Sequence, residues 1–228
     1  MTILITAGPT VEDIDPVRFI SNRSSGKLGF EAAAAAKAAG CRAILIYGPV
    51  AGSLCARIAG LGVGVKSVAV RSAAEMLRAV NAHLPKADAV IMTAAVADFT
   101  PAKFAKVKIK KATHGLILRL KPTVDIAREL GRRKGRRKRP VLIGFALETG
   151  TGRTSAQRRA TQRSEALRKL REKNLDAIVL NSPKTMAAET GDFQVLFRDG
   201  TGLDCRGMSK RRFGRVLIEV AKMLAPQR

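Results

Sequence analysis

The segment ITAGPTVEDIDPVRFISNRSSGKLG, residues Ile5–Gly29, decides how the fold begins, because it joins an apolar run to an alanine-rich helical pattern. The apolar residues Ile3–Ala7 predict a buried parallel strand, and a strand followed by a helix is the repeating unit of α/β folds. The connection between them is unusually long, and long ordered loops in compact domains usually carry function. We therefore expect a first strand, a functional loop and a first helix, in this order.

The end of this loop has the composition of an anion-binding site. Ser24, Ser25 and Gly26 place small side chains and free backbone N–H groups where the next helix starts, which suits a phosphate. Arg18 and Asn22 add a cation and a hydrogen-bonding amide, which suit a substrate with phosphate and carbonyl groups. The loop is not a Walker loop, since GxxxxGK[ST] is absent, and its glycines do not form GxGxxG.

Apolar runs and helical patterns alternate along the chain. The expected strands are Thr2–Ala7, Ala43–Tyr47, Gly64–Val70, Ala89–Ala95, Leu116–Leu120, Val141–Ala146 and Ala177–Leu180, and the expected helices are Lys27–Ala39, Ala73–Leu84, Val124–Leu130 and Ser155–Glu172. Asp199-Gly200 predicts a hairpin between Phe193–Arg198 and Gly202–Cys205, and a last helix follows Ser209. The chain 1–228 is therefore expected to form one α/β domain, a Rossmann-like three-layer sandwich with a mostly parallel central sheet and a β-hairpin appendage.

Two local patterns refine this organisation. Ser72 and Glu75 have the spacing of a capping box and predict where the helix at Ala73 begins. Thr100–Gly115 contains a proline, many lysines and no helical period, which predicts a mobile surface flap.

The charge of the chain is strongly basic, with 42 Lys and Arg against 18 Asp and Glu and a net charge of +24. Such a field attracts polyanions, and the excess is concentrated in Gly131–Pro140 and Arg153–Lys173. Only eight Phe and one Tyr are present, so a surface of stacking aromatic side chains is hard to assemble. Arg132–Arg139 is interpreted first as a solvated loop between helix and strand, with sequence-independent binding of a polyanion as the alternative.

The three cysteines, Cys41, Cys55 and Cys205, lack CxxC spacing and indicate neither a disulfide framework nor a zinc site. The chain starts directly with a strand pattern, without a basic leader and cleavage site, and no run reaches the roughly 18 apolar residues of a membrane helix. We expect a cytoplasmic protein with no membrane contact.

Five ordered motifs resemble phosphopantothenoylcysteine synthetase, the nucleotide-dependent ligase of coenzyme A synthesis. Besides the loop at 5–29, they are Ala94–Asp98 (AAVAD), Lys108–Lys111 (KIKK), Gly144–Thr149 (GFALET) and Lys173–Asp176 (KNLD). The resemblance implies a ligase that joins 4′-phosphopantothenate to L-cysteine through an acyl-nucleotide, with CTP converted to CMP and pyrophosphate and with ATP as the alternative nucleotide. It also implies Mg²⁺, whose ligands stay open.

The resemblance assigns roles to individual residues. Asn22 and Lys108 are expected to be catalytic; Arg18, Asn22, Ser24, Ser25 and Gly26 to bind the acid substrate; and Ala94, Asp98, Lys108, Phe145, Lys169 and Lys173 to bind the nucleotide. Lys169 and Lys173 lie four residues apart and therefore share one face of the expected helix.

The sequence departs from the family pattern in Lys121–Ala127 (KPTVDIA), where Thr123 and Val124 replace the commoner Asn-Pro. The chain begins at the ligase motif, so a separate decarboxylase is expected, and the family implies a homodimer. Two rival readings are a basic α/β nucleic-acid-binding module without ligase activity and a flavin or nicotinamide oxidoreductase, which the missing GxGxxG disfavours. Nucleotide preference, the cysteine site, the geometry of the dimer and any function of residues 131–140 stay open.

Overall fold

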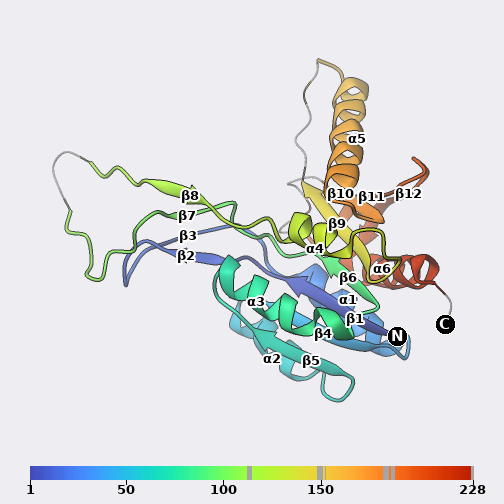
Figure 1. Cartoon of the computed structure of the whole chain (residues 1–228), viewed down its shortest axis with the longest axis horizontal. Helices are drawn as coiled ribbons and strands as arrows, with labels where there is room; N and C mark the ends of the chain where they lie inside the picture. The colour runs from blue at the N-terminus through green and yellow to red at the C-terminus, as the bar shows by residue number, and fades with distance from the viewer. Residues whose placement is uncertain (112–114, 148–150, 152, 182–184, 186–187, 227–228) are drawn as a thin grey trace.

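The computed structural model describes residues 1–111, 115–147, 151, 153–181, 185 and 188–226. The strands of its central sheet are β1 (Thr2–Ala7), β4 (Arg42–Tyr47), β5 (Val65–Ala69), β6 (Ala89–Met92), β9 (Val141–Leu147), β10 (Ala177–Asn181), β11 (Thr190–Phe197) and β12 (Gly202–Ser209). They form one eight-stranded sheet in the order β12-β11-β10-β9-β6-β1-β4-β5 (Figure 1).

The six strands β10, β9, β6, β1, β4 and β5 run parallel to one another. When these parallel strands are numbered 1 to 6 along the chain, they lie in the order 6-5-4-1-2-3, which is the strand order of the Rossmann fold. The order reverses between β1 and β6. The predicted hairpin is confirmed as β11 and β12, which extend the same sheet because β11 pairs antiparallel with β10. The expected Rossmann-like α/β class is therefore confirmed, with the hairpin forming one edge of the main sheet.

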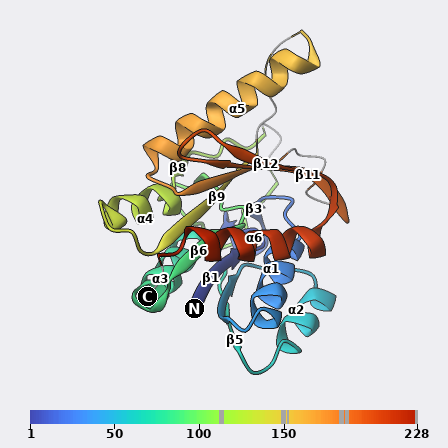
Figure 2. The same ribbon diagram turned by 90° about the vertical axis from the view of Figure 1, so that its right-hand side faces the viewer.

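Helices cover both faces of this sheet (Figure 2). Residues of α1 (Lys27–Ala38), α2 (Gly52–Ala59) and α6 (Lys210–Leu224) belong to one buried cluster, and those of α3 (Ala73–His83), α4 (Ile126–Lys134) and α5 (Ser155–Glu172) to the other. Alternation along the strands supplies both clusters: Ile3 and Ile5 of β1 face the first, and Leu4 faces the second. This is the three-layer arrangement expected from the sequence.

The contact between α1 and α6 is unusually close. A Cβ atom placed on Gly214 of α6 would lie 2.9 Å from the backbone of Glu31 in α1, so the two helices meet backbone to backbone at this point. Beside it, the ring of Phe213 stacks on Phe193 of β11 with 4.0 Å between centroids. The last helix is thus fixed both to the first helix and to the edge of the sheet.

A second structural unit projects from the body as an arm (Figure 1). It consists of two short antiparallel pairs, β2 (Val11–Asp13) with β3 (Phe19–Ser21), and β7 (Phe99–Pro101) with β8 (Leu120–Pro122). The Asp15 carboxylate joins the two, because it accepts hydrogen bonds from the backbone N–H groups of Arg18 and Ile109. The arm is therefore built from the loop at 5–29 together with the excursion that begins at Thr100.

Several expectations from the sequence need correction. Leu116–Leu120 is not a strand of the central sheet; the paired residues are Leu120–Pro122, and they are exposed in the arm. Thr100–Gly115 is not without structure, since Thr100 and Pro101 belong to β7, and residues 112–114 lie outside the described residues. The strand expected to reach Ala95 ends at Met92, because the chain leaves the sheet there to form the loop described below. The helix α2 and the pair β2–β3 were not predicted.

The basic run at 132–139 is also more ordered than a solvated loop. Its first residues complete α4, and Lys134 is buried with its ammonium paired to Asp176. Arg139 makes an ion pair of 3.0 Å with Asp88. In the described part of the chain, no helix has the length and apolarity needed to cross a membrane.

Candidate functional site

A cavity of about 740 Å³ opens at the carboxyl ends of β1, β6 and β9, next to the point where the strand order reverses. Segments 21–29, 92–96, 123–127 and 144–147 line it, together with Asp98, Lys169, Lys173, Asn181 and Lys210. Ligands of open α/β sheets bind at this edge, and the volume is that of a small-molecule site. The structure therefore brings most of the sequence-predicted residues to one place.

The loop that follows β6 is held by the segment that follows β1. Ala95 N donates to Gly8 O over 2.9 Å, and Ala97 N donates to the hydroxyl of Thr10 over 2.9 Å. The hydroxyl of Thr123 donates to Ala97 O over 2.5 Å from the other side. Thr123, one of the departures from the family pattern, thus contributes to holding this loop.

Asn22 adds two further hydrogen bonds to the same loop. Its Nδ2 donates to Ala95 O over 3.0 Å and to Val96 O over 3.2 Å. Both acceptors are carbonyl oxygens, which fixes the orientation of the amide and uses both of its N–H donors. Asn22 lines the cavity as predicted, and it also holds the loop that carries Ala94 and Asp98, a role that the sequence did not reveal.

The predicted phosphate seat lies at the start of α1. Gly26 is the N-cap residue, with a positive φ of 76°, and no side chain caps the helix. A Cβ atom at Gly26 would lie 2.7 Å from Cγ1 of Val50, so glycine is required here for space as well as for conformation. The hydroxyls of Ser24 and Ser25 make only long contacts, of 3.4 and 3.5 Å, with the N–H groups of Gly26 and Lys27. The positive end of α1 thus faces the cavity without an acidic neighbour in its first turn.

Two lysines beside this seat were missed in the sequence. Lys27 lies in the first turn of α1 and pairs with Glu189. Lys210 is only 5% exposed and lines the cavity from the first position of α6. Burial lowers the pKa of Lys210, the charge of Lys27 lowers it further, and Glu189 opposes both effects. Lys27 could have been found as the neighbour of Gly26, whereas Lys210 is far away in sequence and carries no local signal.

The opposite wall holds the basic residues of α5. Lys169 and Lys173 both line the cavity, as their spacing predicted. Lys173 makes an ion pair of 2.8 Å with Asp125, the N-cap residue of α4. Burial alone would raise the pKa of Asp125, but the hydrogen bonds from Lys173 and from the N–H of Arg128 outweigh it and lower the pKa. Asp125 therefore stays ionised and orients Lys173.

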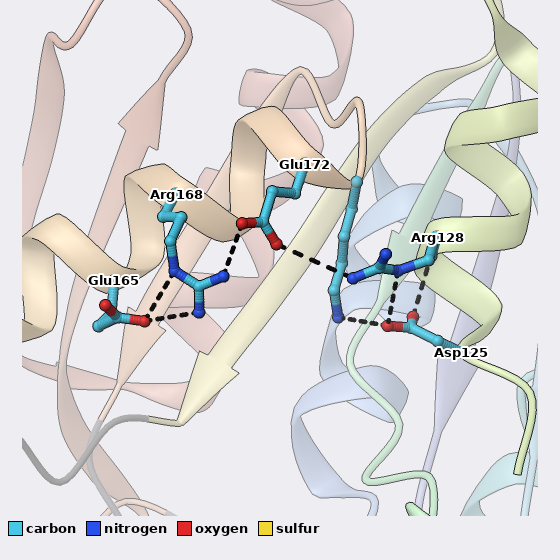
Figure 3. A network of polar contacts seen from close by, with 6 residues as sticks. Asp125, Arg128, Glu165, Arg168 and Glu172 are labelled. Carbon is cyan, nitrogen blue, oxygen red and sulfur yellow. Dashed lines mark hydrogen bonds and ion pairs between the residues drawn. The ribbon is translucent and has the colours of Figure 1, made fainter. Parts of the chain in front are cut away.

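A chain of ion pairs connects α5 to α4 around this contact (Figure 3). Arg168 bridges Glu165 and Glu172 over 2.7 Å each, and Arg128 reaches Glu172 at 3.8 Å and Asp125 at 4.0 Å. These side chains are 38–63% exposed, so each pair contributes little to stability. Together they link α5 to α4 beside the lysines at the cavity.

The other residues that were predicted to bind the nucleotide differ in their surroundings. Ala94 lines the cavity with a side chain small enough to admit a ligand close to the backbone, and Phe145 is half-buried and packs against the core. Asp98 is exposed at the rim. In the part of the chain that the structure describes, no three His, Cys, Asp or Glu residues group as a metal site. Glu148 and Thr149 of the GFALET motif lie outside the described residues.

Two predicted residues are not brought to the cavity. The guanidinium of Arg18 is 2.6 Å from the Asp15 carboxylate and also donates to Ile109 O over 2.5 Å, inside the arm. Lys108 is exposed on the same arm. Burial alone would raise the pKa of Asp15, but hydrogen bonds from the N–H groups of Ile109, Val17 and Arg18 and from the Arg18 guanidinium hold it well below the usual range. Their predicted roles at the site stay predictions.

Comparison with known proteins gives consistent matches. The model of the DNA/pantothenate metabolism flavoprotein C-terminal domain matches residues 1–224. The coenzyme A biosynthesis bifunctional protein CoaBC of Bacillus subtilis is 42% identical over 226 residues, which cover 97% of this chain and 51% of that protein. A cysteine/cysteine sulfinic acid decarboxylase from an unknown prokaryotic organism is 45% identical over 189 residues, covering 83% of this chain and 48% of that protein. The chain thus spans about half the length of these curated relatives.

A solved structure agrees with these relatives. The crystal structure of the C-terminal domain of the bifunctional protein CoaBC superimposes with a TM-score of 0.76 at 36% identity, covering 98% of this chain and 95% of that one. The resemblance stated from the five motifs is therefore confirmed at the level of the family. The chain belongs to the family of the DNA/pantothenate metabolism flavoprotein C-terminal domain, the domain of phosphopantothenoylcysteine synthetase.

Proposed function

We propose that this protein is a phosphopantothenate–cysteine ligase of coenzyme A biosynthesis that uses CTP, with ATP as the alternative nucleotide. The observation that carries the proposal is the joint lining of one cavity by two basic walls. One wall is the open start of α1 with Lys27 and Lys210, and the other is the face of α5 with Lys169 and Lys173. Two anionic substrates held side by side need two such walls.

The chemistry requires an activated acid, because a carboxylate does not release oxide when an amine attacks it. In the first step a carboxylate oxygen of phosphopantothenate attacks the α-phosphorus of CTP, which forms the acyl-CMP anhydride and releases pyrophosphate. In the second step the amine nitrogen of cysteine attacks the acyl carbon, the amide bond forms, CMP leaves and the nitrogen loses a proton. Neither step changes an oxidation state.

The residues of the cavity divide between these tasks. The start of α1 at Ser24–Gly26 would hold the phosphate of the acid, and Lys169 and Lys173 would hold the nucleotide beside Ala94 and Phe145. Asn22, through the loop it fixes, would place the acyl group next to the nucleotide. To donate to the developing oxyanion, its amide would release one of the two carbonyl oxygens of that loop. Lys108 lies on the arm, so it would reach the phosphates of the nucleotide only when the arm closes over the candidate site.

Mg²⁺ fits this site as an ion held mainly by substrate. Magnesium commonly binds through substrate phosphates, waters and one or two carboxylates rather than through an all-protein cage. Asp98, exposed at the rim, would supply such a carboxylate. When bound, the ion would offset the repulsion between the phosphates and the acid.

We also infer that the protein is a homodimer that associates through the arm. Phe99, Phe104, Val107 and Ile117 expose 49–92% of their surface on this unit, and exposed apolar side chains that gather on one unit mark a site of association. The short two-stranded pairs also leave strand edges open for pairing. Light scattering should give twice the chain mass, and Ile117→Ser with Phe104→Ser should give the monomer mass. A wild-type monomer would exclude the dimer.

The ligase proposal is tested by pyrophosphate release. The purified protein with Mg²⁺, phosphopantothenate and CTP should release pyrophosphate, and added L-cysteine should give phosphopantothenoylcysteine. ATP in place of CTP ranks the two nucleotides. If no nucleotide supports pyrophosphate release, the ligase proposal is wrong. A decarboxylase partner stays a prediction; one relative carries decarboxylase in its name.

A further inference from the structure

A second cavity, of about 1210 Å³, lies at the opposite edge of the sheet from the candidate site. The starts of β1, β4 and β5, the approaches to β6 and β9, and the end of α4 line it. These are the amino ends of the parallel strands, whereas the candidate site uses their carboxyl ends. The two cavities therefore lie at opposite ends of the strands, and we call the second one the amino-edge cavity.

The lining of this amino-edge cavity is strongly basic. Its charged residues are Arg42, Lys66, Lys86, Arg133, Lys134, Arg137 and Arg139 against one acid, Asp88. They come from four separate segments of the chain, which only the fold brings together. The basic run that sequence analysis noted at 132–139 supplies more than half of them.

Three of these cations already have acidic partners. Lys134 pairs with Asp176, and Arg139 lies 3.0 Å from Asp88. Arg133 lies 2.6 Å from a glutamate of its own helix. Asp88 is further engaged, because its Oδ2 accepts a hydrogen bond of 2.7 Å from the N–H of Thr2. These pairs hold the walls of the cavity in place.

The other four, Arg42, Lys66, Lys86 and Arg137, are exposed, and no ion pair joins any of them to an acid among the residues that the structure describes. Their effect on a neighbour is visible in His83 at the end of α3. Burial lowers the pKa of His83, and the charges of Lys66 and Lys86 lower it further. The cavity thus holds uncompensated positive charge around a concave surface.

The shape and chemistry of the lining define what would bind there. Among the residues that the structure describes, the lining contains no Phe, Tyr or Trp, so a base or sugar finds no aromatic surface on which to stack. Four unpaired cations on different walls suit an anion with several linked charges, and the volume exceeds that of an ordinary small-molecule site. We propose that the amino-edge cavity is a second, non-catalytic site that binds a chain of linked phosphates, the chemistry shared by inorganic polyphosphate and a nucleic-acid backbone.

The test separates this cavity from the overall charge of +24. Lys86→Ala with Arg137→Ala removes two cations from the cavity, and Arg211→Ala with Arg215→Ala removes two exposed cations from α6, outside both cavities. Binding of inorganic tripolyphosphate is measured by calorimetry in the wild type and in both variants, which leave the lining of the candidate site unchanged. Binding of a fluorescent single-stranded 20-nucleotide DNA is measured by anisotropy in parallel.

The cavity variant should weaken binding by about tenfold or more, and the α6 variant by less than about twofold, because a local phosphate contact outweighs a change in distant charge. Pyrophosphate release at the candidate site should be unchanged in both variants. Loss with tripolyphosphate alone would assign free polyphosphate as the ligand, and loss with DNA would assign a nucleic-acid backbone. Equal losses in the two variants, or no binding of either probe to the wild type, would overturn the proposal.

Discussion

Asn22→Asp replaces the amide donor of the loop after β6 with a carboxylate of nearly the same shape. In the wild type Nδ2 donates to Ala95 O over 3.0 Å and to Val96 O over 3.2 Å. An ionised carboxylate can only accept, so it would face two carbonyl oxygens. Each hydrogen bond contributes about 0.5–1.5 kcal/mol net, so the two together hold the loop by about 1–3 kcal/mol. Because Asn22 is exposed, water screens the added repulsion.

We expect the Kd for CTP to rise by roughly 5- to 150-fold in this variant, which is the same free energy expressed as an affinity. Calorimetry with CTP measures this Kd. The rates of pyrophosphate release and of product formation measure the two half-reactions. Asn22→Ala is the matched control, because it removes the donors without adding charge. Product formation should fall further in the Asp variant than in the Ala variant, since only Asp places a negative charge beside the oxyanion. Wild-type CTP affinity and product formation in Asn22→Asp would refute this reasoning.

Four further predictions concern single residues. Lys173→Met should raise the Kd for CTP by about 10- to 100-fold and that for phosphopantothenate much less; equal effects on both would point to a folding defect instead. Lys108→Gln should slow turnover by about 30- to 1000-fold while the matched arm variant Lys106→Gln does not, and equal rates would remove Lys108 from the reaction. Because the pKa of Asp15 is lowered in the folded state, its contribution to stability is present above about pH 4 and is lost as the pH falls below that value. The urea midpoint of unfolding should therefore fall less between pH 6 and pH 3 in Asp15→Asn than in the wild type. An equal fall of the midpoint in both proteins would contradict this assignment. Gly214→Ala should cost about 1–3 kcal/mol in urea unfolding, because its Cβ would press on the α1 backbone, whereas a neutral result would show that the helices can part.

The order of strands and helices was predictable because the relevant signals are local. The helix at Ser155–Glu172 has the bounds that were predicted, and Ser72 caps α3 by accepting from the N–H of Glu75. Elements whose stability depends on distant partners were missed or misplaced. β8 pairs with β7 in the arm rather than entering the sheet, and its exposed residues have no alternation that a sequence pattern could register.

The candidate site divides in the same way. Ser24–Gly26, Ala94 and Lys173 line the cavity because each follows a recognisable strand end or helix face. Lys210 was missed because it reaches the cavity only through the docking of α6 on α1. The ion pair between Lys173 and Asp125 joins segments 48 positions apart (173 − 125), and sequence spacing holds no information on such a contact.

The docking of α6 on α1 sets the order in which the domain can be completed during synthesis. Because α1 precedes α6 by most of the domain, it is synthesised long before residues 210–224, which cover part of its apolar face. Closing so long a loop is slow, and apolar surface left uncovered in the meantime is prone to aggregation. The apolar face of α1 therefore stays partly uncovered until α6 has been synthesised and has docked, so the domain is completed only after this fifteen-residue helix has formed.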